Sequence, residues 1–433
     1  MRVLGVSETC DLAALYLALQ AEGHEVRVAI SEPEARGTLA GLCPTTADWR
    51  AELAWIRQVG EDGIVVFESV SEGFGALQDQ LRADGFQVIG GSAYGDRLEN
   101  DRAYAQDLLA ELGFPSGHVW TFPGPHEALA FIADNPGRYV LKYSGPDHAS
   151  SDNYLGQLAD GADVVAVLRS RSAAAPGAGD PLILMRFIEG VEMGVGAYFN
   201  GEAFIRPACL DWEHKRFFNG DLGELTGEMG TVVTYDRTER FFERTLARME
   251  PHLRAHGHVG YVNLNTIVND AGIWPLEFSC RFGYPGYAIL SPLQADGWGD
   301  LLHAMVRRTP ARMATRPGFC LGVVLTTPPF PYTRKQVAEP VGLPVLIEGG
   351  LDLRRHHLGE VGLDAAGQLV TSGLYGWTLV ATGEGPTIAQ AQREAYRTAQ
   401  GVFAPNLRYR TDIGDRLIKG DYQRVADLGL LDD

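Results

Sequence analysis

The sequence predicts an α/β protein, and the pattern of its first hundred residues predicts a doubly wound domain. The opening MRVLGV is a short apolar run typical of a buried strand, and a helical pattern rich in Ala and Leu follows from Asp11 to Ala21. With the strand-like EVRVAI that comes next, these elements form a βαβ unit. Strand-like segments at 63–69 and 87–91, with a helical segment at 74–84 between them, continue the alternation.

The chain beyond residue 100 mixes strands and helices. A helix is expected from about Arg102 to Leu112, because Gly113 and Pro115 would end it. The strand-like segments HVWTF, RYVLKYSG and PLILMRFIEG follow. The stretch at 171–181 is rich in Ala, Gly and Pro and is interpreted as a surface connection. Two further helices are expected at about 237–256 and 387–402.

Length and charge limit the classes of function. A chain of 433 residues, 45% of them hydrophobic, exceeds one simple core and predicts two to four domains. The 37 Lys and Arg residues against 55 Asp and Glu residues give a net charge of -18, which opposes binding to nucleic acid. A small phosphorylated ligand stays compatible, because a magnesium ion and a few local basic side chains can neutralise its phosphates.

The cysteines and the apolar segments indicate a cytoplasmic protein. The five cysteines are widely spaced and form no CxxC pair, which favours a reducing compartment. Glu8 and Asp11 interrupt the N-terminal apolar stretch, so it predicts a strand and not a signal peptide. No apolar run approaches the length of a membrane span. We expect small-molecule partners, no nucleic-acid or membrane partner, and a monomer or a homodimer.

Two strand ends carry candidate nucleotide contacts. Lys142 ends the strand YVLK before the loop SGPDHASSDNYLG, where a cation could meet phosphate oxygens. In LILMRFIEGVEMG, a strand and turn precede Glu192, so the backbone could hold a flat base and the acid a ribose. Taken singly, each is better interpreted as an ordinary surface feature, a strand-end lysine and a hairpin with a solvated glutamate.

The segment at 211–230, DWEHKRFFNGDLGELTGEMG, mixes charges with glycines. Glu213, His214, Lys215, Arg216 and Asp221 crowd into it. A binding loop is favoured over a plain solvated loop, because glycines allow the backbone to approach a ligand closely.

The strongest segment is GYVNLNTIVNDAGIWPLEFSCRFGYPG, two strands joined by the turn NDAG. Pairing of these strands would bring Asn265 and Glu277 together, and Ser279 lies on the same face as Glu277. These oxygen donors suit a magnesium ion, while Arg281 is placed to meet a carboxylate or a phosphate. A buried Glu-Arg ion pair is the alternative interpretation.

Taken in order, these segments resemble the glycinamide ribonucleotide synthetases, or phosphoribosylamine-glycine ligases, of the ATP-grasp superfamily. LENDRAYAQDLLAELGFPS resembles the family's Leu-Glu-Gly-Ser-Lys stretch, with Arg102 in place of its ATP-contacting lysine. EHKRFFNGDLGELTGEMG resembles its Asp-His-Lys-Arg and Gly-Pro-Asn-Thr-Gly-Gly-Met-Gly loop. LEFSCRFGYPG resembles its Glu-Phe-Asn-x-Arg-Phe-Gly-Asp-Pro-Glu element. The tail from TSGLYGWTLVATGEG to RYRTDIG follows its C-terminal domain, so the resemblance covers about Leu98 to Leu417.

The resemblance implies an ATP-grasp fold with an N-terminal doubly wound domain and a C-terminal α+β domain. The expected division is an N-terminal substrate domain at 1–100, an A lobe at 101–120 and 182–312, a B lobe at 121–181 and a C-terminal domain at 313–433. ATP would lie between the A and B lobes.

The resemblance also implies roles for individual residues. Arg102 and Lys142 would hold the phosphates of ATP, the backbone at Met185, Arg186, Phe187 and Ile188 the adenine, and Glu192 the ribose. Glu277, Ser279 and Asn265 would hold Mg²⁺, with Mn²⁺ as the alternative ion, and Arg281, Lys215 and His214 would act on the reacting groups. The implied reaction phosphorylates a carboxylate, and an amine then displaces the phosphate to form an amide.

Several departures from the family's pattern fall at the substrate and phosphate positions. The family's loop with Gly-Arg-Glu-His is GVSETCDLA here, and FESVSEG places Glu68 and Glu72 where a phosphosugar would lie. Acids there oppose a phosphate. The glycine-rich lid has become SGPDHASSDNYLG, which leaves His148 in place of a lysine. Ser279 replaces an asparagine, and Tyr284 would line a more aromatic pocket.

Three hypotheses follow. The first is an ATP-dependent carboxylate-amine ligase whose amine is not phosphoribosylamine, or is a modified relative of it. The second is a genuine phosphoribosylamine-glycine ligase of purine biosynthesis with an unusual first loop. The third is a non-catalytic nucleotide-binding homologue, suggested by the altered lid and by Ser279.

Overall fold

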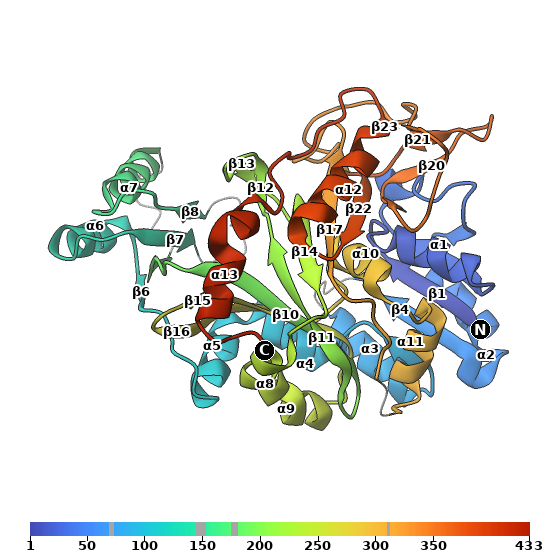
Figure 1. The fold of residues 1–433 in the computed structure, drawn as a ribbon, viewed down its shortest axis with the longest axis horizontal. Coiled ribbons are helices and arrows are strands. Elements are labelled where there is room, and N and C mark those ends of the chain that lie inside the picture. The colour runs from blue at the N-terminus through green and yellow to red at the C-terminus, as the bar shows by residue number, and fades with distance from the viewer. Residues whose placement is uncertain (69–72, 144–152, 175–180, 310–311) are drawn as a thin grey trace. The chain divides into compact units, whose positions relative to one another are not determined.

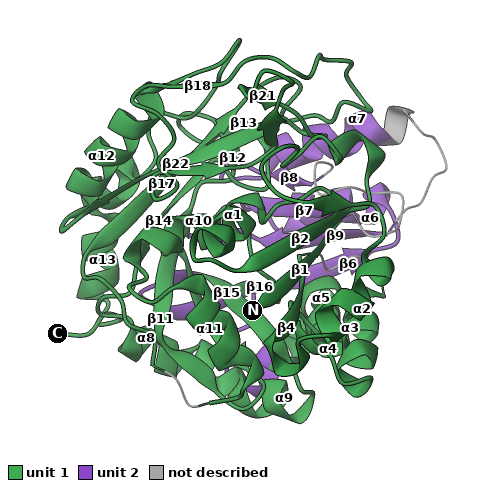
Figure 2. Ribbon diagram, turned by 90° about the vertical axis from the view of Figure 1, so that its right-hand side faces the viewer, with its two compact units in different colours: residues 1–108, 191–266, 276–433 green, residues 109–190, 267–275 purple. Residues whose placement is uncertain are grey.

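The computed structural model describes residues 1–68, 73–143, 153–174, 181–309 and 312–433. The chain divides into two compact units (Figure 2): residues 1–108, 191–266 and 276–433 form unit 1, and residues 109–190 and 267–275 form unit 2. The four-part division expected from the sequence stays a prediction. All five cysteines are free and buried. No helix in the described ranges is long and apolar enough to cross a membrane.

Unit 1 begins with a five-stranded parallel sheet of order β3-β2-β1-β4-β5, which confirms the predicted N-terminal alternation. Val6 of β1 lies opposite both Ala29 of β2 and Phe67 of β4. Because the strands are parallel, the carboxyl ends of β1 and β4 meet at one edge of the sheet. The strands are β1 (Arg2–Ser7), β2 (Glu25–Ile30), β3 (Thr45–Thr46), β4 (Gly63–Phe67) and β5 (Gln87–Ile89), with helices α1 (Ala13–Ala21), α2 (Leu53–Arg57), α3 (Phe74–Ala83) and α4 (Ala93–Asn100).

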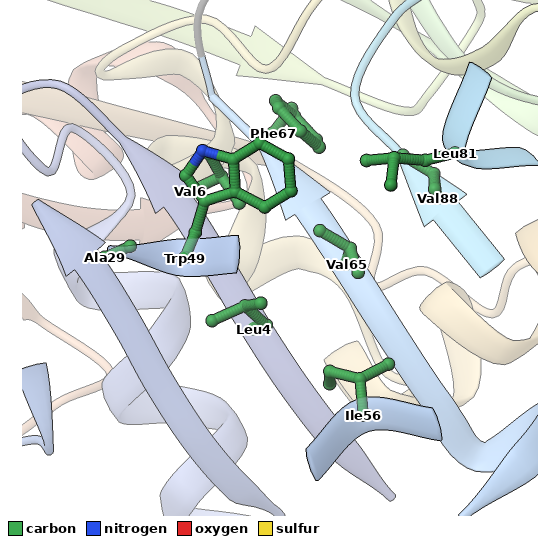
Figure 3. Packing of buried hydrophobic residues seen from close by; sticks show 9 residues of the cluster. All are labelled: Leu4, Val6, Ala29, Trp49, Ile56, Val65, Phe67, Leu81 and Val88. Carbon is green, nitrogen blue, oxygen red and sulfur yellow. The ribbon is translucent and has the colours of Figure 1, made fainter. Parts of the chain in front are cut away.

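An apolar core holds this sheet against its helices (Figure 3). The rings of Trp49 and Phe67 meet edge to face, with their centroids 5.8 Å apart. Leu4 and Val65, fully buried on neighbouring strands, continue the core toward Ile56 of α2. Such packing fixes the two strand ends that carry Ser7 and Glu68.

The centre of unit 1 is an eight-stranded sheet of order β16-β15-β10-β11-β14-β17-β22-β19 (Figure 1). The predicted neighbours β15 and β16 lie side by side at one edge, which confirms that Asn265 and Glu277 come from adjacent strands. The strands are β10 (Val191–Asn200), β11 (Phe204–Glu213), β14 (Gly230–Thr234), β15 (Val259–Asn269), β16 (Gly272–Ser279), β17 (Phe319–Thr326), β19 (His356–Leu358) and β22 (Trp377–Gly385).

Helix α12 (Ile388–Gln400) confirms the helix predicted at 387–402, and it packs on β17 and β22. The approach is close: a Cβ at Gly383 would lie 2.1 Å from the backbone nitrogen of Ala395. Three short hairpins or pairs complete the sheets of unit 1: β12 (Arg216–Phe218) with β13 (Leu222–Leu225), β20 (Val361–Leu363) with β21 (Leu369–Thr371), and β18 (Leu346–Ile347) with β23 (Val402–Phe403). The other helices there are α10 (Gly286–Leu290), α11 (Trp298–Val306) and α13 (Tyr422–Asp427).

The single helix predicted at 237–256 is wrong. The structure has α8 (Glu239–Arg244), a 3-10 turn at Leu246–Met249 and α9 (Glu250–Ala255). Thr245 breaks the run with φ of -128° and ψ of -99°, and its hydroxyl donates to the carbonyl of Phe241 at 2.5 Å. α9 then begins at Glu250 with Pro251 in its first turn, because a proline has no N–H to continue a helix but fits a first turn.

Unit 2 is a four-stranded antiparallel sheet of order β6-β9-β7-β8 with two helices. Ala128 and Ile132 of α6 and Val164 and Leu168 of α7 share a buried core with Tyr139 and the strands. The elements are β6 (Val119–Phe122), α6 (Pro125–Asp134), β7 (Tyr139–Tyr143), β8 (Tyr154–Leu155), α7 (Ala162–Ala174) and β9 (Leu182–Arg186), preceded by α5 (Arg102–Glu111), whose residues divide between the two units.

Candidate active site

Unit 1 contains a cavity of about 530 Å³ at the edge where β1 and β4 end. Its walls come from the loop after β1, from β11, β14, β15 and β16, and from segments at 281–290 and 375–377. The predicted residues Lys215, Asn265, Glu277, Ser279 and Arg281 all line it. The tertiary structure thus brings together, in one cavity, candidate site residues that lie on separate segments of the sequence.

Lys215 is the centre of an ion cluster in this cavity. Its Nζ lies 3.2 Å from Glu213 Oε2, 3.2 Å from Glu277 Oε1 and 3.6 Å from Glu192 Oε1. Burial alone would lower the pKa of Lys215, but the three carboxylates raise it well above its ordinary value. Lys215 is therefore a fixed positive charge surrounded by three acids, which suits a group that faces phosphate oxygens.

Two amides connect this cluster to its neighbours. Asn265 Nδ2 donates to Glu192 Oε1 at 2.9 Å, and Asn263 Nδ2 donates to Asp211 Oδ2 at 2.6 Å. Burial and then the charge of Glu213 raise the pKa of Asp211 to about 8. The amides of β15 thereby orient Glu192 on β10 and Asp211 on β11. In the sheet, β15 lies between β10 and β16, the strand that carries Glu277.

The donor set fits a magnesium ion of the kind that a nucleotide brings with it. No group of three or more His, Cys, Asp and Glu side chains in the described ranges is arranged as a metal cage. Mg²⁺ is usually held by one or two carboxylates together with phosphates and water, so a complete protein cage is not required. Glu277, Asn265 and Ser279, all lining the cavity, would supply that partial shell.

Two arginines were predicted at the site, and only Arg281 is among the residues that line the cavity. Burial lowers the pKa of Arg102, and the negative charge of Glu277 opposes this change. Arg281 Nη2 lies 3.3 Å from Glu99 Oε1, and the other oxygen of Glu99 accepts the backbone N–H of Cys280 at 2.8 Å. Glu99 thus holds the backbone and the guanidinium of the same loop.

The loop after β1 binds a carboxylate of the chain itself, that of Glu68, which follows β4. Glu68 Oε2 accepts hydrogen bonds from Ser7 Oγ at 2.7 Å and from the backbone N–H of Leu12 at 3.2 Å, and Oε1 accepts from Tyr16 Oη at 2.5 Å. Burial raises the pKa of Glu68 to about 7, and the charge of Asp11 adds to the effect. Glu8 and Asp11 also line the cavity, whereas Glu72 and His148 lie outside the described residues.

An aromatic stack forms another wall. Tyr284 lines the pocket, as expected. The centroid of its ring lies 4.5 Å from that of Trp377, and the Trp377 centroid lies 5.4 Å from that of Tyr375. Buried Glu360 accepts backbone N–H groups from Leu374 to Trp377, at distances of 2.5 to 3.2 Å. One carboxylate therefore fixes the turn that presents the last two rings.

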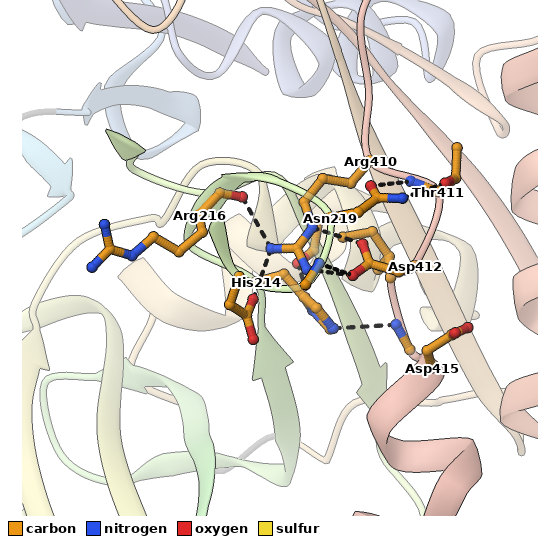
Figure 4. Close-up of polar contacts among 12 residues, drawn as sticks. His214, Arg216, Asn219, Arg410, Thr411, Asp412 and Asp415 are labelled. Atoms are coloured by element: carbon orange, nitrogen blue, oxygen red, sulfur yellow. Dashed lines mark hydrogen bonds and ion pairs between the residues drawn. The ribbon is translucent and has the colours of Figure 1, made fainter. Parts of the chain in front are cut away.

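His214, predicted to act on the reacting groups, does not line the cavity. Its Nδ1 lies 3.2 Å from the carbonyl oxygen of Gly230, and the backbone N–H of Gly414 donates to its Nε2 at 3.2 Å. Burial lowers its pKa to about 4. His214 thus joins β14 to the C-terminal segment, next to a network around Arg410 that is drawn in Figure 4.

Arg410 ties the β12–β13 hairpin to the same C-terminal segment. Its guanidinium donates to Asp412 at 2.8 Å, to Asp221 at 2.9 Å and to the carbonyl oxygen of Arg216 at 3.0 Å. Asn219 adds a side-chain bond to Thr411 at 2.6 Å (Figure 4). Within the 211–230 segment, Glu213 and Lys215 therefore line the cavity, whereas Asp221 belongs to this structural network.

The remaining predicted residues lie in unit 2. Lys142 of β7 stands opposite Ile183 of β9, two residues before Met185. The backbone N–H of Arg186 donates to the carbonyl of His118, and that of Phe187 to the carbonyl of Arg138, both at 3.0 Å. The adenine and phosphate contacts expected of Lys142 and of residues 185–188 stay predictions.

The sequence interpretation missed several residues that line the cavity or shape it. Asn263 alternates with Asn265 on β15, and that two-residue period was a usable signal. A second usable signal was Glu228, which in GEMG replaces the second glycine of the family's Gly-Gly-Met-Gly. The others gave no local signal: Asp211, Tyr375, Trp377 and Glu360.

Comparison with known proteins supports the fold and the resemblance. Residues 100–287 match the family model described as the ATP-grasp (A) domain of phosphoribosylglycinamide synthetase. The phosphoribosylamine-glycine ligase of Yersinia pestis is 28% identical over 366 residues, 78% of this chain and 80% of that one. The enzyme of that name from Neisseria meningitidis serogroup B is 26% identical over 364 residues, 79% of this chain and 81% of that one.

Two solved structures share the fold. The phosphoribosylamine-glycine ligase of Thermotoga maritima aligns with 95% of this chain and 100% of that one, at a TM-score of 0.70 and 22% identity. The biotin carboxylase domain of 2-oxoglutarate carboxylase from Hydrogenobacter thermophilus, determined with MgADP and bicarbonate, covers 94% of this chain and 91% of that one, at a TM-score of 0.63 and 12% identity. The predicted ATP-grasp fold is thereby confirmed.

Proposed function

We propose that this chain, an ATP-grasp ligase that resembles the phosphoribosylamine-glycine ligases, joins a carboxylate to an amine with cleavage of ATP to ADP and phosphate. A carboxylate oxygen of the substrate attacks the γ-phosphorus of ATP, and ADP leaves. The amine nitrogen then attacks the carbonyl carbon of the acyl phosphate, the bond from that carbon to the phosphate oxygen breaks, and the nitrogen loses a proton. An amide and inorganic phosphate result.

The observation that carries this proposal is the composition of one cavity. Glu277, with Asn265 and Ser279, offers oxygen donors to a magnesium ion, and Lys215 stands 3.2 Å from Glu277. Arg281 lines the same volume. A metal-binding acid, a cation for phosphate and an arginine for a carboxylate are the parts that carboxylate activation requires. A non-catalytic homologue has less support, because the named relatives are ligases.

Each residue would have a limited task. Glu277, Asn265 and Ser279 would hold Mg²⁺, which supplies charge neutralisation at the phosphates when it is bound. Arg281, anchored by Glu99, would orient the substrate carboxylate with its planar fork. Lys215 would place a positive charge beside the transferred phosphoryl group, since its ammonium stays protonated.

For the substrates, the comparisons favour phosphoribosylamine and glycine, the pair in the names of the relatives, over the interpretation that the amine is a different one. This pair is therefore the first candidate. Growth of a purine auxotroph lacking its own phosphoribosylamine-glycine ligase, restored by this chain, would support it directly.

A specific observation favours a second candidate, the same reaction on an amine without a phosphate. Glu68 already accepts hydrogen bonds from Ser7 Oγ and from the backbone N–H of Leu12 at the start of α1. Glu8 and Asp11 line the same cavity. Helix N-termini attract anions, and here the anion belongs to the protein itself. A phosphate would have to approach three acids.

One assay tests the ligase function without knowledge of the amine. Hydroxylamine attacks acyl phosphates, so a panel of carboxylic acids with Mg²⁺, ATP and hydroxylamine should yield a hydroxamate and stoichiometric ADP. Phosphoribosylamine with glycine and a panel of amines with the active acid then identify the pair. ATP binding with neither hydroxamate nor ADP release across the whole panel would overturn the ligase proposal and favour a nucleotide-binding protein.

A further inference from the structure

The cavity is strongly acidic. Seven of the residues that line it are carboxylic acids and two are basic: Glu8, Asp11, Glu68, Asp211, Glu213, Glu228 and Glu277, against Lys215 and Arg281. Both basic groups already have acidic neighbours, since Lys215 contacts three glutamates and Arg281 contacts Glu99. A cationic ligand therefore meets more carboxyl partners here than an anionic ligand meets basic ones.

Glu228 is the acid whose position is hardest to explain without a ligand. It lines the cavity with only 4% of its surface exposed, and its Oε1 has no hydrogen-bond partner among the described residues. Burial, followed by the charges of Glu213 and Asp211, raises its pKa well above the ordinary value. A buried carboxylate without a partner is costly, so Glu228 keeps its proton when no cation is near. A bound cation would lower this pKa and stabilise the carboxylate.

The aromatic stack lies beside the same acids. Tyr284, Asp11 and Glu228 all line the cavity. Burial raises the pKa of Tyr284, and the charges of Asp11, Glu360 and Glu228 add to this effect. Tyr284 Oη and Trp377 Nε1 are also buried polar atoms without hydrogen-bond partners in the described part of the chain. The wall thus offers ring faces and two polar atoms next to the acids, and aromatic faces attract organic cations.

We propose that the part of the cavity bounded by Asp11, Glu228 and the stack of Tyr284, Trp377 and Tyr375 binds a primary amine as an organic ammonium ion with an apolar or aromatic body. The inference rests on the ligase function proposed above and names the class of its amine. The ammonium would donate to Glu228 Oε1 and to Asp11, while the body of the amine packs on the tyrosine rings. Trp377 Nε1 would donate to a neutral oxygen of the ligand.

The same groups suit the second half-reaction. An ammonium ion has no free electron pair, so one proton must move from nitrogen to a carboxylate before the attack. Glu228 or Asp11 would accept that proton. The nitrogen pair then forms the bond to the acyl carbon, the carbon–oxygen bond to phosphate breaks, phosphate leaves with its electron pair, and the nitrogen gives its second proton to the leaving phosphate. The acids thereby bind the amine and activate it.

Equilibrium binding tests this inference separately from turnover. The full chain, with Mg²⁺ and a non-hydrolysable ATP analogue, is titrated in a calorimeter with 2-phenylethylamine, tyramine, 1,4-diaminobutane and ethanolamine. Ribose 5-phosphate serves as the anionic probe. We expect an arylalkylamine to bind best and at least tenfold more tightly than ribose 5-phosphate. Tighter binding of ribose 5-phosphate, or no binding by any amine, overturns the inference.

Matched variants locate the site. Glu228→Gln should weaken amine binding at least tenfold, whereas Glu224→Gln, four residues away in the same segment and outside the cavity lining, should leave it unchanged. Asp11→Asn is the second variant, and thermal melting checks that each protein is folded. Full amine affinity in both Glu228→Gln and Asp11→Asn would overturn the inference. Amine binding without ADP release in the hydroxylamine assay would instead refute only the ligase function.

Discussion

The carboxylate of Glu68 accepts a hydrogen bond from the backbone N–H of Leu12 at 3.2 Å, so the end of β4 supplies an anion to the start of α1. The two residues are 56 positions apart in the sequence and meet because β1 and β4 are parallel neighbours. An exogenous phosphate at this turn would compete with a group that the fold itself provides.

Stability should depend on the protonation of Glu68. Its pKa is about 7 in the folded chain against an ordinary value of 4.5, so between these pH values the folded state holds a proton that the unfolded state has lost. The contribution of Glu68 to the unfolding free energy therefore falls as pH rises from 4.5 to 7, by on the order of 3 kcal/mol.

Glu68→Gln removes this titration. Urea unfolding of both proteins at pH 4.5, 5.5, 6.5 and 7.5 should show the wild type losing stability relative to the variant across the series. Glu360, whose pKa is also about 7, is present in both proteins and cancels in the difference. A difference that stays constant with pH would contradict this account.

Glu277→Gln should lower ATP turnover by two orders of magnitude or more while the fold stays intact. The amide fills the same space and can still accept from Lys215, but a neutral oxygen binds magnesium poorly. Steady-state ADP release measures the effect, and melting temperature confirms the fold. Glu224→Gln is the control that should retain activity. Wild-type turnover in Glu277→Gln would remove Glu277 from the site.

Arg281→Lys should be nearly as damaging as Arg281→Ala, with each lowering kcat/KM at least a hundredfold. The guanidinium lies 3.3 Å from Glu99 and can still offer two in-plane N–H donors along one edge to a substrate carboxylate, which a lysine point charge cannot reproduce. Kinetics with the acid identified by the hydroxamate assay provide the comparison. Recovery of most activity by lysine would show that Arg281 acts through its charge alone, and equal losses of melting temperature would indicate a structural role.

Arg410→Met should cost about 3 kcal/mol of unfolding free energy, because Asp221 and Asp412 would lose their ion pairs with a guanidinium whose side chain is only 2% exposed. Arg416→Met is the matched control. Arg416 pairs with Asp221 and Asp421 at 3.3 and 3.2 Å, but 58% of its side chain is exposed, so the loss should stay below about 1 kcal/mol. Chemical denaturation of both variants measures the contrast, and equal losses would contradict it.

Prediction from sequence succeeded where the signal was local. The alternation of apolar runs with a helical pattern predicted β1, α1 and β2, and the turn NDAG predicted that Asn265 and Glu277 lie on neighbouring strands. It failed where local patterns compete. The helix predicted at 237–256 is broken at Thr245, whose hydroxyl donates to the carbonyl of Phe241, and a second helix begins at Glu250.

The sequence by itself determined the α/β class and the motif order of the ATP-grasp resemblance, because strand and helix periodicity and motif spacing are properties of neighbouring residues. Only the tertiary structure decided which charges share a cavity. His214 and Lys215 are adjacent in the chain, yet His214 hydrogen-bonds to Gly230 and Gly414, whereas Lys215 forms an ion pair with Glu277 in the cavity. Glu228 and Tyr284 line the same cavity although 56 positions separate them, since the placement of distant segments is fixed by packing and not by local sequence.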